Sequence, residues 1–165
     1  MTDLLFPVDG FVLRDAKDDD RPFFICCMTE SILLSVNGPE REHSELWMDD
    51  ILNVTAIASD GGMMRSELFI LDDADRERAG MLWMGVSRDQ FTCEETGYLL
   101  GVFVNEGLRG KGIGKALIGC AEDWCRKNGL MSLTLNTGSP NIAAKNIYRR
   151  LGFDERSTVM RKRLR

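Results

Sequence analysis

One stretch constrains the fold of this chain more than any other: an apolar run passes into a glycine-rich turn and then into a helical pattern. The run ends at Val104, and the glycine-rich turn, residues 109–115, reads Arg-Gly-Lys-Gly-Ile-Gly-Lys. A helix that starts near Gly112 presents free N–H groups and the positive end of its dipole to this turn, an arrangement that binds anions. The stretch therefore predicts a phosphate or pyrophosphate site formed by Arg109, Gly110, Lys111, Gly112, Gly114 and Lys115.

Two well-known glycine motifs do not match this turn. A P-loop would need glycine where Arg109 stands and Ser or Thr where Ala116 stands. A dinucleotide fingerprint would need a third glycine where Lys115 or Leu117 stands, and an acid where Asn136 ends the next strand. The sequence thus disfavours both nucleotide-binding classes, while a turn that binds another phosphate ligand, or that merely connects two elements, stays open.

Length and charge limit the remaining classes. At 165 residues the chain is predicted to be one domain, residues 1–165. Its net charge is −5, and its one basic tract is Arg161–Arg165, so nucleic acid is not an expected partner.

The cysteine and histidine pattern argues against a metal site. The five cysteines form no C-x-x-C pair, and His43 is the one histidine. Scattered thiols favour a reducing compartment, and neither a signal peptide nor a membrane-spanning run is recognised. A cytoplasmic protein with no metal and no membrane contact is expected.

Periodicity and turn residues predict the order β-α-α-β-β-β-α-β-α-β. The expected strands are residues 10–14, 67–71, 80–86, 98–104, 131–136 and 157–162, and the expected helices begin near Arg21, Glu40, Gly112 and Ser139. The second helix carries its apolar residues on one stripe as far as Gly61.

A second motif follows one strand after the glycine-rich turn. It consists of Asn141, Ala144, Ile147 and Tyr148 on one helix, followed by Gly152-Phe153. Together with Arg-x-x-Gly-x-Gly, this arrangement resembles the GNAT superfamily of N-acetyltransferases over nearly the whole chain. The resemblance implies an α/β fold (α+β by some schemes), with helices on both faces of a mixed sheet of about six strands. Its two central parallel strands, Tyr98–Val104 and Met131–Thr137, would splay apart to admit acetyl-CoA.

The resemblance also implies roles for individual residues. The backbone of Val102 and Val104 would hold the pantetheine arm, and Asn136 and Asn141 would contact the cofactor. Tyr148 would be the acid, because a phenol of pKa about 10 can reprotonate a thiolate whose conjugate acid has a pKa of about 8.5. A tyrosine that only covers the sheet is the alternative.

The general base is not apparent from the sequence. Many relatives have a Glu within the fourth strand, whereas Tyr98–Val104 contains no acid. Glu95, or Glu94 beside it, just before the strand, could act directly or through water, and His43 is a further candidate. For each of them the alternative is a solvated surface charge, the more common role of such residues.

We therefore expect an acyl-CoA-dependent N-acetyltransferase that acts on a primary amine of a small molecule, protein or peptide, by direct transfer in a ternary complex. Only one strand is expected after Phe153, which leaves the acceptor side open or completed by a second subunit in a homodimer. The alternative is a non-catalytic regulatory module that binds acyl-CoA but lacks a base.

Overall fold

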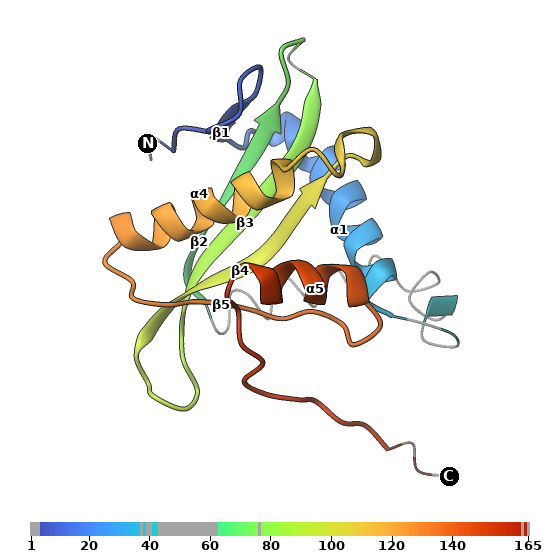
Figure 1. The fold of residues 1–165 in the computed structure, drawn as a ribbon, viewed down its shortest axis with the longest axis vertical. Helices are drawn as coiled ribbons and strands as arrows, with labels where there is room; N and C mark the ends of the chain where they lie inside the picture. The colour runs from blue at the N-terminus through green and yellow to red at the C-terminus, as the bar shows by residue number, and fades with distance from the viewer. Residues whose placement is uncertain are drawn as a thin grey trace.

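The computed structural model describes residues 4–36, 38, 41–42, 63–75, 77–162 and 164. Within these residues, five strands form one sheet in the order β1-β2-β3-β4-β5 (Figure 1). The strands are β1 Val12–Asp15, β2 Met63–Asp72, β3 Arg78–Arg88, β4 Glu95–Val104 and β5 Leu133–Leu135. The first four pair antiparallel, and β5 runs parallel to β4, so the predicted mixed α/β sheet is confirmed.

Helices cover both faces of this sheet. The helices are α1 Arg21–Ser35, α4 Ile113–Lys127 and α5 Ile142–Arg150, with short 3-10 turns η1 Asp18–Asp20 and η2 Glu106–Leu108. Figure 1 shows α4 lying across one face of the sheet and α1 behind the other. Among the described residues, no helix combines the length and apolar character that crossing a membrane requires.

Strand β3 is buried on both faces because each face meets a different helix layer. Leu82 and Met84 join the core cluster that includes the inner side of α4, whereas Met81 and Trp83 join the cluster beneath α1. Successive side chains of a strand point to opposite faces, so a strand covered on both sides reads as one continuous apolar run. This accounts for the sequence from Ala79 to Val86, in which every residue is buried.

The predicted last strand is wrong. Residues 157–162 have no regular structure, and Figure 1 shows this segment leading away from the body of the protein. Val159 and Met160 are 91 % and 90 % exposed, so the apolar residues of this segment meet neither a neighbouring strand nor a core. The expected six strands become five among the described residues, and the second predicted helix, from Glu40 to Gly61, falls almost wholly outside them. The homodimer stays a prediction, and the terminal strand on which it was based is absent from the described residues.

A buried carboxylate ties the start of α1 to the sheet. Asp20 is fully buried and accepts hydrogen bonds from the Arg14 guanidinium at 2.7 and 3.1 Å, from Arg78 Nε at 2.6 Å and from the Lys17 N–H at 2.8 Å. Arg14 also binds Asp72 of β2 at 2.6 Å. These contacts, and above all the hydrogen bond from the Arg14 guanidinium, hold the pKa of the Asp20 carboxyl well below its usual range.

Replacing Asp20 with Asn should destabilise the protein by about 3 kcal/mol, because two guanidinium groups would lose their buried counter-charge. The matched control is Asp19→Asn: that side chain is 74 % exposed and lies 3.4 Å from Arg78, so little loss is expected. Urea unfolding at pH 7 measures both variants. Since folding lowers the pKa of Asp20, its stabilisation is complete above the unfolded value of about 4 and declines as the pH falls below it. Equal unfolding midpoints for the two variants would contradict this role.

Candidate functional site

The sheet opens between its two parallel strands. Strand β5 pairs with β4 only at Gly97, Tyr98 and Leu99, and no pair follows in the direction of Val104. On its other side, β4 has a bulge at Leu100, where the register to β3 shifts between Trp83 and Met84. From residue 100 onward, the edge of β4 that faced β5 therefore has no strand partner within the described part of the chain. This opening agrees with the predicted splay, although β5 is shorter than the expected Met131–Thr137.

The glycine-rich turn lies at this open end. Gly110 and Gly112 have φ angles of 78° and 83°, in the left-handed region that strongly favours glycine. Gly112 directly precedes α4, and the N–H of Ala116 donates to its carbonyl at 3.0 Å. The N–H groups of residues 113–115 precede this first helical bond, and the structure gives no side-chain cap at Gly112 from any residue that it describes. These donors and the helix dipole together form a site suited to a phosphate group.

The turn and the open strand edge are in contact. A Cβ atom placed on Gly114 would lie 3.9 Å from Cγ2 of Val104, the last residue of β4. Val104 is buried and Val102 is half-buried, so it is their backbone that borders the opening. Lys111 and Lys115 are exposed and add positive charge beside the helix start. This arrangement suits an elongated ligand whose phosphate binds at the start of α4 and whose amide groups pair with the open edge of β4.

The side chain of Arg109 is 41 % exposed, but its polar atoms contact the protein. Its Nε–H donates to the Val104 carbonyl at 2.9 Å, and its guanidinium pairs with Glu30 of α1 at 2.5 Å. The sequence alone does not indicate this role for Glu30, because Glu30 stands 79 residues from Arg109 and belongs to no local motif.

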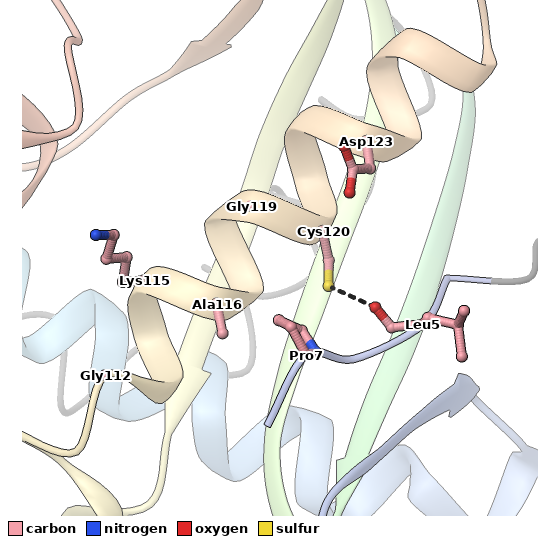
Figure 2. A pocket seen from close by; sticks show the side chains of 8 residues that line it. All are labelled: Leu5, Pro7, Gly112, Lys115, Ala116, Gly119, Cys120 and Asp123. Carbon is pink, nitrogen blue, oxygen red and sulfur yellow. Dashed lines mark hydrogen bonds between the residues drawn. The ribbon is translucent and has the colours of Figure 1, made fainter. Parts of the chain in front are cut away.

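A cavity of about 390 Å³ lies on the flank of α4 that faces the N-terminal segment (Figure 2). Its walls are Leu5, Pro7, Gly112, Lys115, Ala116, Gly119, Cys120 and Asp123. The thiol of Cys120 donates to the Leu5 carbonyl at 3.8 Å and so joins the two walls. In Figure 2 the side chain of Lys115 extends away from Leu5 and Pro7.

Helix α5 supplies Tyr148 and Asn141. Tyr148 is half-buried, packs edge-on against Phe153 with ring centres 5.6 Å apart, and contacts the core cluster that includes Val104. Burial raises the pKa of Tyr148 above its ordinary value, which keeps the phenol protonated at neutral pH. Asn141 caps α5, because its Oδ1 accepts the N–H of Ala144 at 3.2 Å. Asn136 is exposed and directly follows β5.

Glu95 stands apart from this group. It is the first residue of β4, opposite Arg88, and not part of the preceding loop as the sequence suggested. It is exposed and lies at the end where β4 and β5 are paired, seven residues before Val102. That separation corresponds to roughly 20 Å of extended chain. The structure therefore does not bring Glu95 to the open edge, and His43 lies outside the described residues.

Comparison with known proteins adds independent findings. The sequence model of the Acetyltransferase (GNAT) family matches residues 32–153. The chain is 41 % identical over 58 residues to an uncharacterized N-acetyltransferase of Methanocaldococcus jannaschii, a match that covers 35 % of this chain and 26 % of the relative. It is 34 % identical over 90 residues to the streptothricin acetyltransferase of Streptomyces lavendulae, covering 53 % and 44 %. These matches thus span less than two thirds of either relative's length.

Solved structures share the fold over a greater length. A Pyrococcus furiosus protein described as an acetyl transferase superimposes with a TM-score of 0.75 over 93 % of this chain and 99 % of its own. The sequence identity is 22 %, so this likeness concerns the arrangement of helices and strands.

Proposed function

Because the chain belongs to the Acetyltransferase (GNAT) family, we propose that it transfers an acetyl group from acetyl-CoA to a primary amine. One observation carries this proposal: the open edge of β4 adjoins the uncapped start of α4. The pyrophosphate of acetyl-CoA would bind to the N–H groups of the glycine-rich turn. The amide groups of its pantetheine arm would pair with the open edge near Val102 and Val104, as an added strand does.

The chemistry then follows as direct transfer in a ternary complex. The neutral amine nitrogen attacks the thioester carbonyl, the N–C bond forms, and the C–S bond breaks. Tyr148 would donate its proton to the departing thiolate, because burial raises the pKa of its phenol and so leaves it protonated at neutral pH, and the phenolate would regain a proton from solvent. The amine loses its extra proton to water, because the one acid within β4, Glu95, stands at the far end of the strand. Asn141 would reach the cofactor through its Nδ2 group, since its Oδ1 already caps α5.

The acceptor is an amine of one of two size classes. The name of the streptothricin acetyltransferase favours a small molecule with amino groups. The departure of residues 157–162 from the body, which leaves no strand beyond β5 among the described residues, instead favours a larger acceptor such as a protein N-terminus.

A thiol-release assay with acetyl-CoA tests the proposal against amines, polyamines, aminoglycosides and peptide N-termini. We expect thiol release that depends on one acceptor class and rises with pH until that amine is fully deprotonated, because only the neutral amine is nucleophilic. A rate that is independent of pH below the amine pKa would contradict direct attack by a free amine.

The second candidate is a regulatory module that binds acyl-CoA without turnover. The distance of Glu95 from the open edge is the observation that favours it. Tight acetyl-CoA binding combined with no thiol release across the whole panel would select this candidate and exclude the enzyme.

A further inference from the structure

Arg109 joins three elements at the place where the two halves of the proposed site meet. Its guanidinium pairs with Glu30 of α1 at 2.5 Å, and its Nε–H donates to the carbonyl at the end of β4 at 2.9 Å. The guanidinium carbon also lies 5.3 Å from the ring centre of Phe103, within the range of a cation–π contact. Its backbone N–H donates to the carbonyl of Glu106 at 3.1 Å, which closes η2. Both the backbone and the side chain of Arg109 are therefore held by the protein.

This anchoring sets the geometry of the residues on either side. Immediately after Arg109 comes Gly110, where the backbone turns into the left-handed region and leads to α4. Five residues before it is Val104, whose carbonyl Arg109 holds. A shift of Arg109 would thus move the helix start and the end of β4 relative to each other. Those are the two parts that a single elongated ligand would have to contact at once.

The charge balance argues that Arg109 is not itself the phosphate contact. Glu30 lies at ion-pair distance, so the pair offers an anion little net charge. Lys111 and Lys115 are exposed beside the same turn and provide the positive charge. An arginine suits the anchoring role because its planar fork donates in several fixed directions, which a lysine ammonium cannot reproduce.

We infer that Arg109, held by Glu30, is a positioning residue that fixes the phosphate-binding turn relative to the open edge of β4. This inference rests on the proposed binding of acyl-CoA, and it assigns to Glu30 a role in cofactor binding at a distance from the chemistry. Arg109 acts through the backbone on both sides of it.

Two thioesters separate positioning from phosphate contact. Acetyl-CoA carries the pyrophosphate, whereas S-acetylpantetheine presents the same thioester and amides without any phosphate. Arg109→Lys keeps the charge but loses the fork. Because the guanidinium also holds the Val104 carbonyl, its loss displaces the end of the open edge itself, so a positioning role predicts that Kd and KM rise for both thioesters by about tenfold. A rise for acetyl-CoA alone would show a phosphate contact and overturn the inference. A lower unfolding midpoint with unchanged Kd for both would show a purely structural role and also overturn it.

Glu30→Gln is a second test, because the inference and its alternative predict opposite changes in the affinity for acetyl-CoA. If Glu30 orients Arg109, Glu30→Gln lowers the affinity for both thioesters by about threefold. In the double variant with Arg109→Lys it causes no further loss of affinity, because the two residues act as one unit. If Glu30 acts only through its charge, its removal tightens acetyl-CoA and leaves S-acetylpantetheine unchanged, which contradicts the inference.

The experiment distinguishes failure of the proposed acetyl transfer from failure of the role inferred for Arg109. If the wild-type protein binds both thioesters but acetylates nothing, the proposed transfer fails, and the ratios of Kd still decide the role of Arg109. If calorimetry finds neither thioester bound by the wild-type protein, both proposals fail.

Discussion

Replacing Tyr148 with Phe should lower kcat by about 10²–10⁴, equivalent to roughly 3–5 kcal/mol of activation free energy, while the affinity for acetyl-CoA changes little. The expected loss is confined to turnover because the thiolate that receives the proton carries its charge only late in the reaction. Phe keeps the ring that packs against Phe153, so the helix should remain in place. Steady-state kinetics on an accepted amine should show lower kcat at nearly constant KM.

The matched control is Tyr98→Phe, because Tyr98 is the other tyrosine of the chain. Tyr98 is also half-buried, and burial also raises its pKa, but it lies where β4 and β5 are still paired. Its replacement should leave kcat within about threefold of wild type, as expected of a tyrosine without a catalytic role. If both variants lose activity equally, or if neither does, the assignment of the acid to Tyr148 fails.

The pH profile gives an independent check of the same role. Burial raises the pKa of Tyr148 above its ordinary value of about 10, so the phenol stays protonated through neutral pH. With the acceptor amine saturating, kcat should therefore show no alkaline decline until the pH exceeds about 10. A decline near pH 8 that persists in Tyr148→Phe would point to a different acid.

The strands that the sequence predicted well are those buried on both faces. The run from Ala79 to Val86 is apolar because α1 and α4 cover opposite faces, and this double burial is visible in the sequence itself. The glycine-rich turn was equally visible, because left-handed backbone at Gly110 and Gly112 needs glycine. The strand predicted at residues 157–162 was wrong, because residue types that favour strands indicate only a tendency, whereas a strand also needs a neighbour to pair with.

The candidate site was predictable only in part, since side-chain direction depends on contacts between distant residues. Arg109 was correctly located in the turn, but its contact with Glu30 depends on how α1, 79 residues earlier, packs beside the turn. Gly138 shows the same limit: a Cβ there would lie 2.0 Å from the carbonyl oxygen of Ser35, at the end of α1. No local pattern reports such a close approach. Glu95 was assigned to the preceding loop, because β4 begins with Glu95, Thr96 and Gly97, which resemble a loop sequence.

Filling the space between α4 and β4 should abolish acetyl-CoA binding, and Gly114→Val is the substitution that does so with least strain. Gly110 and Gly112 have positive φ angles, so a side chain at either position would distort the backbone. Gly114 lies within the first turn of α4, and its Cβ would make only an ordinary contact with Val104. Side chains on a helix lean toward its N-terminus, so the valine would cover the free N–H groups. Two lost charge-assisted hydrogen bonds would weaken binding by about 10² or more.

Gly119→Val is the control because it places the same side chain in the same helix, where a Cβ meets nothing within 4 Å. Both variants replace a helical glycine with the same β-branched residue, so helix propensity should shift their unfolding midpoints by comparable, small amounts. Calorimetric titration with acetyl-CoA should then give near wild-type affinity for Gly119→Val and no measurable heat for Gly114→Val at the same concentrations. Equal affinities would mean that the pyrophosphate does not bind at the start of α4, and the site would have to be sought elsewhere along the open edge of β4.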